Sequence, residues 1–173
     1  MKNIKFIKIR NVKSPNRGTK VSSGIDFYIP NDLVEVKTTP WELWTINKVT
    51  LLEKENIFKK WFIINPLEGV LIPSWIKTII PTWYDLVFDN KSWISFKKWL
   101  IIWAKVIDSD YRWEIHLHLV NISNISIFVE LWEKITQWIV RKVELCELEE
   151  VNEEFFNEET ERWSWGFGST GTI

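Results

Sequence analysis

The feature of this chain that most constrains its fold is the shortness of its apolar segments. Apolar runs recur along the whole sequence and are bounded by turn residues, a pattern typical of strands joined by tight connections. The segment Glu114–Leu119 alternates apolar and polar residues with a period of two, as expected of a half-buried strand. No stretch keeps a 3.6-residue period, so we predict an all-β fold. Strands are expected at Ile4–Ile9, Thr50–Leu52, Trp61–Ile64, Val70–Ile72, Ile76–Ile80, Tyr84–Phe88, Leu100–Ile107, Glu114–Val120, Ile125–Leu131 and Lys134–Val143.

Charge and cysteine content exclude several classes of protein. A formal net charge of -1 argues against nucleic-acid binding through phosphate contacts. The single Cys146 excludes a disulfide framework and a cysteine-cluster metal site, and it favours a reducing, cytoplasmic setting. The first ten residues lack the apolar stretch of a signal peptide, and the longest apolar run, Trp99–Ile107, is interrupted by Lys105. We therefore expect neither a secretion signal nor a membrane span.

The composition changes near the C-terminus. Residues Glu144–Glu161 read ELCELEEVNEEFFNEETE, a dense run of acidic side chains typical of a solvated segment. We predict a folded core over residues 1–146, followed by an acidic tether and mobile tail over residues 147–173. The end of the tail is either plainly disordered, or it orders over a ligand by stacking Phe167 and binding phosphate through backbone N–H groups.

Tryptophan and glycine occur in unusual proportion, with 13 tryptophans and only 6 glycines. Many tryptophans follow turn residues: Trp75 follows Pro-Ser, Trp83 follows Pro-Thr and Trp113 follows Asp-Tyr-Arg. Such positions favour a residue that can adopt positive φ and penalise a bulky one. One interpretation is a Trp-rich binding surface, as in a carbohydrate-binding module. The other is that the gene's UGA codons specify glycine and were rendered as tryptophan, with Trp138 the least certain case.

Five segments resemble, in order, the motifs of trimeric dUTP pyrophosphatases (dUTPases) of the phage and bacterial type when glycine is read at the tryptophan positions. The resemblance implies a distorted jelly-roll β-barrel with a flexible C-terminal tail. The chain departs from the family pattern at Lys91, where arginine is common, and in an apparent insertion around residues 34–60. The five motifs are Ser23–Tyr28, Asn90–Trp93, Val106–Trp113, Trp132–Gln137 and Arg162–Gly171.

The resemblance implies hydrolysis of dUTP to dUMP and pyrophosphate, which limits uracil incorporation into DNA and supplies dUMP for dTMP synthesis. It implies Asp108 as the general base, acting through a water that attacks the α-phosphorus. It also implies Mg²⁺ held by the phosphates and by waters, with Asp26 acting through a water and no direct protein ligand. The active sites are expected to be shared between the subunits of a homotrimer, the tail of one subunit reaching over a neighbour's site.

The remaining site residues are expected to bind the substrate. Tyr111 would pack against the deoxyribose and leave no room for a 2′-hydroxyl, while the backbone of Val106 and Ile107 would read the uracil edge. Phe167 would stack on uracil. Trp93 is expected to belong to the substrate-binding set. Phosphate contacts are expected from Lys91, Ser92, Gln137, Arg162, Gly168, Ser169 and Thr170, of which Arg162 suits the γ-phosphate because its guanidinium can bind two oxygens.

Other functions remain open at this point. A dCTP deaminase or a bifunctional deaminase–dUTPase would share the fold, although Asp108–Tyr111 followed by the tail favours the dUTPase branch. A dUTPase-like protein that binds a regulatory partner would have a natural partner surface in the insertion at residues 34–60. Asp-Ser-Asp at 108–110 also suits a plain turn, and His116 and His118 are interpreted as strand residues and not as metal ligands.

Overall fold

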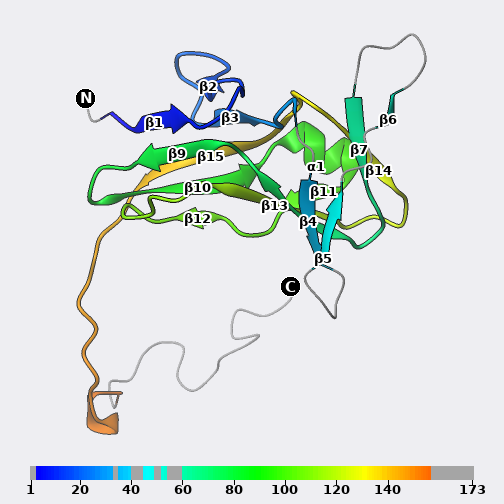
Figure 1. The fold of residues 1–173 in the computed structure, drawn as a ribbon. Coiled ribbons are helices and arrows are strands. Elements are labelled where there is room, and N and C mark those ends of the chain that lie inside the picture. Colours follow the sequence, from blue (N-terminus) through cyan, green and yellow to red (C-terminus); the bar gives the residue numbers. More distant parts are fainter. Residues whose placement is uncertain (1–2, 33–34, 40–44, 49–51, 54–59, 157–173) are drawn as a thin grey trace.

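The computed structural model describes residues 3–32, 35–39, 45–48, 52–53 and 60–156. These residues form strands almost throughout, with one short helix, α1 (Ser92–Lys98), and one 3₁₀ turn, η1 (Glu153–Phe156), as Figure 1 shows. The prediction of an all-β fold is therefore confirmed. The strands are β1 (Lys5–Lys8), β2 (Asn16–Arg17), β3 (Ile25–Tyr28), β4 (Glu35–Thr39), β5 (Thr45–Lys48), β6 (Leu52–Glu53), β7 (Lys60–Ile64), β8 (Gly69–Pro73), β9 (Ile76–Ile79), β10 (Tyr84–Asn90), β11 (Leu100–Ile102), β12 (Val106–Ile107), β13 (His116–Asn121), β14 (Ile127–Glu130) and β15 (Lys134–Lys142).

Two five-stranded antiparallel sheets make up most of the body. The first has the strand order β12-β10-β15-β3-β2 and the second the order β11-β13-β8-β4-β5. A three-stranded sheet, β14-β7-β6, and a β1-β9 pair complete the described part of the chain. Most neighbours in these sheets are far apart in sequence, although β2–β3, β4–β5 and β6–β7 are consecutive, so long-range pairing fixes most of the register.

One apolar core joins the sheets. Its aromatic centre lies on the first sheet, where the ring of Trp138 lies 4.3 Å from that of Phe27 and 5.7 Å from that of Phe88. Side chains of the second and third sheets, such as Ile72 and Ile64, belong to the same buried cluster. Large aromatic side chains contribute strongly to such a core because each removes a large apolar area from water.

Strand β13 confirms the period-two prediction. Leu117 and Leu119 point into the core and are buried, whereas His116 and His118 between them are partly exposed. The alternation follows from the pleat of a strand, which directs successive side chains to opposite faces.

The expected strand over Leu100–Ile107 is wrong as a single element. The chain forms β11, leaves that sheet at Trp103, and then forms β12 in the other sheet. Trp103 N–H still donates to His118 O in the second sheet at 2.8 Å, and Lys105 O accepts the N–H of Phe88 in the first sheet at 2.8 Å. The segment between β11 and β12 is therefore hydrogen-bonded to both sheets. An apolar run reports burial but not the sheet to which each residue belongs.

The insertion around residues 34–60 contains short strands. Strand β4 pairs with β8 and with β5, so this part of the insertion extends the second sheet. Strand β6 pairs with β7 at Leu52–Trp61 and Glu53–Lys60. Of the strand expected at Thr50–Leu52, residues 50 and 51 lie outside the described residues. Strands β2 and β3 were not expected from the sequence.

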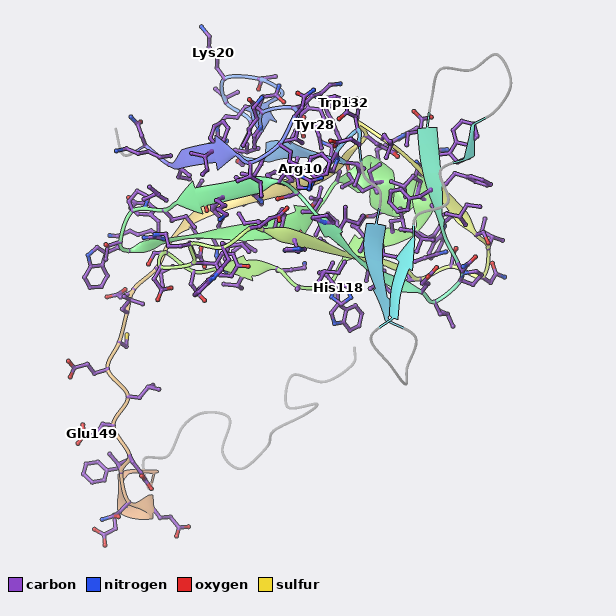
Figure 2. All side chains as sticks on the ribbon, in the orientation of Figure 1. Arg10, Lys20, Tyr28, His118, Trp132 and Glu149 are labelled. Carbon is purple, nitrogen blue, oxygen red and sulfur yellow. The ribbon has the colours of Figure 1, made fainter. Side chains whose placement is uncertain are left out.

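The chain leaves the body after β15. In Figures 1 and 2 the segment that carries Glu149 runs away from the sheets and ends in η1. Leu145, Leu148 and Phe155 on this segment are exposed. Residues 157–173 lie outside the described residues, so the predicted boundary at residue 146 stays a prediction. Among the described residues no helix has the length and apolar character needed to cross a membrane.

Candidate functional site

Asp26 in β3 is the charged centre of the first group of site residues. Its side chain is 8% exposed, and each of its oxygens meets a lysine. Lys91, at the N-cap of α1, binds Oδ1, and Lys134, at the start of β15, lies 2.9 Å from Oδ2. The two ammonium groups compensate the desolvation of the carboxylate.

The lysines decide the charge state of this carboxyl group. Burial acts to raise the pKa of Asp26, but the hydrogen bonds and charges of Lys91 and Lys134 outweigh it and hold the pKa below the ordinary value of 3.8. The Asp26 hydrogen bond in turn raises the pKa of Lys134 above 10.5. The group is therefore a carboxylate between two ammonium ions at neutral pH.

Gln137 in β15 lies beside this cluster and is fixed by the backbone. Its Nε2 donates to Asn90 O at 3.0 Å, immediately before Lys91. A Cβ on Gly24 would lie 2.0 Å from Gln137 Oε1, so only glycine leaves room for the amide at that position. Motifs one, two and four thus meet at one place, through Gly24, Asp26, Asn90, Lys91 and Gln137.

A second ion pair ties the motif-two helix to motif four. Lys98 Nζ in the last turn of α1 lies 2.7 Å from the Glu133 carboxylate and donates to Phe128 O at 2.8 Å. Glu133 also accepts the backbone N–H of Glu130 at 3.0 Å. Sequence reasoning gave roles to neither Lys98 nor Lys134, since an ion pair between residues so far apart in sequence leaves no local pattern.

The predicted residues Lys91, Ser92 and Trp93 begin or precede α1. Ser92 and Trp93 are exposed, and Lys91 has a side chain 26% exposed. Ser92 is exposed next to the Lys91 ammonium group, so a phosphate could contact both side chains at this edge.

Asp108 and Tyr111 form a second group on the loop between β12 and β13. Tyr111 N–H donates to Asp108 O at 3.2 Å, so the segment is also the turn that its composition predicts. Tyr111 packs against the core, and its hydroxyl donates to Glu114 O at 2.9 Å. Arg112 Nη1 donates to Ser109 O at 2.6 Å. The Asp108 side chain is exposed.

A cavity of about 360 Å³ borders Asp108. Asp85 and Asp110 line it as well, together with Val143 and Leu145 at the start of the C-terminal segment. Asp85 is buried, and its carboxylate accepts hydrogen bonds from Nε and Nη2 of Arg141 at 3.2 and 2.5 Å. A larger cavity of about 640 Å³ is lined by Arg17, Ile25 and Tyr84 among others, and none of the predicted site residues that the structure describes lines it.

The two groups lie at opposite ends of β10. Val106 pairs with Val87 at the middle of this strand, and Ile107 pairs with Leu86 toward its beginning, so the chain runs on to Asp108 beside the first residues of β10, whereas Gln137 pairs with Asp89 near its end. Figure 1 shows β12 along the part of β10 that is remote from α1. From Asp85, beside Asp108, to Lys91 the strand advances six residues, about 20 Å at 3.4 Å per residue.

The predicted tail residues Arg162, Phe167, Gly168, Ser169 and Thr170 lie outside the described residues. Within the described part of the chain, no group of three or more His, Cys, Asp and Glu side chains is placed to hold a metal ion.

The comparisons with known proteins converge. The dUTPase family profile matches residues 59–171, more than half of the chain. The deoxyuridine 5′-triphosphate nucleotidohydrolase of Finegoldia magna is 33% identical over 170 residues, covering 97% of this chain and 98% of that protein. The chain belongs to the dUTPase family. The prediction of a dUTPase-family enzyme is thereby confirmed.

Other dUTPases match less of the chain or only its fold. The enzyme of the same name from Fusobacterium nucleatum is 34% identical over 110 residues, which is 62% of this chain and 73% of that protein. The Staphylococcus bacteriophage 80alpha dUTPase G164S mutant, solved with dUpNHpp, superposes with a TM-score of 0.72 at 18% identity, over 99% of both chains. The dUTPase from phage phi11 of S. aureus gives a TM-score of 0.65 at 15% identity, over 94% of this chain and 100% of that one. These structures confirm the expected dUTPase-like fold.

Proposed function

We propose that this chain hydrolyses dUTP to dUMP and pyrophosphate with Mg²⁺, in a homotrimer whose active sites combine residues of different copies. The reaction would limit uracil incorporation into DNA and supply dUMP. Family membership supports the substrate. The observation that carries the proposal is the separation of Asp108 from Lys91 and Gln137 along β10. A general base must lie within hydrogen-bond reach of the proton it takes, and this separation supports a site in which Asp108 and the phosphate-binding residues come from different chains.

The end of β10 near α1 would bind the triphosphate. Lys91 now binds Asp26, and a triphosphate beside Ser92 offers it a stronger negative partner. Lys134 remains on the other oxygen of Asp26, so the carboxylate stays paired when Lys91 turns to the phosphates. Gln137, held by Asn90 O and confined by Gly24, would present its amide to the same phosphates.

The other end of β10 would supply the base and bind the nucleoside. Asp108 is exposed at its cavity and would take a proton from the attacking water. The Tyr111 ring is held by the core and by Glu114 O, which suits a rigid wall against deoxyribose. The backbone of Val106 and Ile107 would read uracil. In the tail, Arg162 and Gly168 to Thr170 would hold phosphates, and Phe167 would stack on the base and exclude water.

Asp26 is the described residue that suits an indirect role toward Mg²⁺. One lysine can leave it while the other neutralises it, so the carboxylate would accept a hydrogen bond from a magnesium-bound water. The ion, when bound, neutralises phosphate charge.

Complementation between two inactive variants tests the shared site. Asp108→Asn removes the base, and Lys91→Met removes the phosphate-binding lysine. Each variant alone is expected to lose pyrophosphate release from dUTP. Chains co-refolded from a mixture of the two are expected to recover part of the activity, because some sites combine an intact Asp108 with an intact Lys91.

Lys97→Met is the matched control, since Lys97 lies on the same helix over the rings of Trp93 and Phe96. It should retain activity by itself. Mixtures that stay inactive although the variants co-assemble would contradict the shared site, and absence of pyrophosphate release from the unaltered chain would contradict dUTP hydrolysis.

A further inference from the structure

Tryptophan is concentrated at the backbone positions that disfavour it most. Among the described residues, the non-glycine residues with positive φ are Leu67, Trp75, Trp83, Trp99 and Trp132, with φ between 52° and 71°. With 13 tryptophans in 173 residues, five positions drawn at random would hold fewer than one on average. A Cβ in this conformation crowds the neighbouring carbonyl oxygen, and a bulky side chain is rarely found there.

Two of the four tryptophans stand at the third position of a four-residue turn. Tyr84 N–H closes one turn on Pro81 O at 3.1 Å, with Trp83 third and φ 71°. Glu133 N–H closes the other on Glu130 O at 3.2 Å, with Trp132 third and φ 68°. A type II turn requires positive φ at this position and takes glycine there.

Trp99 ends helix α1 in the left-handed conformation, with φ 52° and its N–H bound to Ser95 O at 3.1 Å. This residue after a helix is where glycine is most enriched, because it completes the C-cap without steric cost. Trp75 has φ 58°, and both of its backbone polar groups are hydrogen-bonded: the N–H donates to Glu114 Oε1 at 2.8 Å, and the carbonyl oxygen accepts from Ile9 N–H at 2.9 Å.

Two of these side chains are exposed and add little to the fold, whereas the Trp75 indole is 4% exposed and belongs to the core, so at position 75 the argument rests on the backbone alone. Trp83 and Trp99 are half exposed, at 49% and 56%. Trp132 lies near Tyr28 in Figure 2, with Lys13 Nζ 4.6 Å from the centroid of its ring. An exposed indole on a strained backbone has no compensating burial.

Trp61 and Trp138 differ from these four residues in backbone conformation. They lie within strands β7 and β15, with extended backbone. Trp138 is 2% exposed and packs on Phe27 and Phe88. Trp61 packs edge-on against Phe128, with ring centroids 6.5 Å apart. Strand positions in contact with aromatic neighbours favour tryptophan.

We infer that the functional protein carries glycine at positions 75, 83, 99 and 132 and tryptophan at positions 61 and 138. The first set corresponds to UGA codons read as glycine and the second to UGG codons. Three of the glycines adjoin the candidate site: position 83 lines the cavity of Asp108, position 99 ends the helix that begins at Ser92, and position 132 precedes Glu133. They would set backbone turns that position site residues. The inference does not depend on the substrate.

The coding DNA gives the first test. UGA is expected at positions 75, 83, 99 and 132, and UGG at 61 and 138. Peptide masses of the protein purified from its own host should show glycine at the first four. UGG codons at those four positions, or tryptophan in those peptides, would overturn the inference.

Thermal unfolding gives an independent test of the backbone reasoning. Trp83→Gly and Trp99→Gly are each expected to raise the midpoint temperature by about 2–8 °C, because the left-handed strain is removed. Trp99→Ala is the matched control: it removes the indole but keeps the Cβ, so it should give none of this rise. Equal midpoints for Trp99→Gly and Trp99→Ala would contradict the inference. Trp138→Gly should lower the midpoint, and a rise would contradict tryptophan at that position.

Discussion

Lys98 Nζ, in the last turn of α1, lies 2.7 Å from the Glu133 carboxylate, in the turn that precedes β15. This ion pair joins the helix that begins at Ser92 to the strand that carries Gln137. Both side chains are mostly buried, at 26% and 18% exposed, so water screens the pair less than it screens a surface pair.

Replacing Lys98 by Met should therefore lower the free energy of unfolding by about 1–2 kcal/mol, because Glu133 and Phe128 O lose a charged donor. Urea unfolding measures this change. Lys97→Met, one residue away, should change the free energy by less than about 0.5 kcal/mol. Equal effects of the two substitutions would show that the ion pair adds nothing.

Gly24→Ala should impair substrate binding, since its Cβ would lie 2.0 Å from Gln137 Oε1 and force the amide off Asn90 O. We expect a raised KM for dUTP. The matched control is Gly18→Ala, whose Cβ would meet its nearest atom, Ser22 Oγ, at 3.7 Å. That variant should bind dUTP normally, and steady-state kinetics on both distinguishes a local clash from a general effect of alanine.

Lys134→Met removes the partner of Asp26 Oδ2 and leaves a nearly buried carboxylate with Lys91 alone. Because Lys134 is itself partly exposed, the expected loss of unfolding free energy is about 1–2 kcal/mol. Lys134→Arg should recover most of it, whereas Lys142→Met, at the other end of β15, should be close to neutral. Denaturant unfolding of the three variants decides between an ion pair with Asp26 and a general effect of charge on the strand.

His118 should make stability depend on pH. Burial lowers its pKa below the ordinary value of 6.5, so the unfolded chain binds the proton more readily than the folded one. Stability is then fully present above pH 6.5 and is lost as pH falls from 6.5 through the lower folded-state pKa. His118→Gln should flatten this part of the stability curve. His116→Gln, on the same face of β13, controls for losing an imidazole, and an unchanged slope in His118→Gln would refute the assignment.

The sequence predicts strands well where burial follows local pattern. The alternation at Glu114–Leu119 identifies β13 because one face of that strand lies against the core. Helix α1 was missed because seven residues make about two turns, too few to establish a 3.6-residue period. The run from Leu100 to Ile107 hid a change of sheet, since both halves contact the core.

The candidate site likewise contains residues that the sequence identifies and residues that it does not. Asp26, Lys91 and Gln137 were named from motifs, and the structure brings them together. Lys98 and Lys134 were missed, because their partners lie 35 and 108 residues away and depend on how β3, β15 and α1 pack. No local pattern encodes such a register.

Strand β10 separates the two groups of site residues, and this separation has a consequence for kinetics. If no single chain can assemble a complete site, a lone subunit is catalytically silent however well it folds. Specific activity should then fall when the protein is diluted and its subunits dissociate, and it should recover when the protein is concentrated. The rate of dUTP hydrolysis would therefore rise more steeply than linearly with chain concentration. In a cell that makes little of it, assembly and not turnover would set the rate at which dUTP is removed.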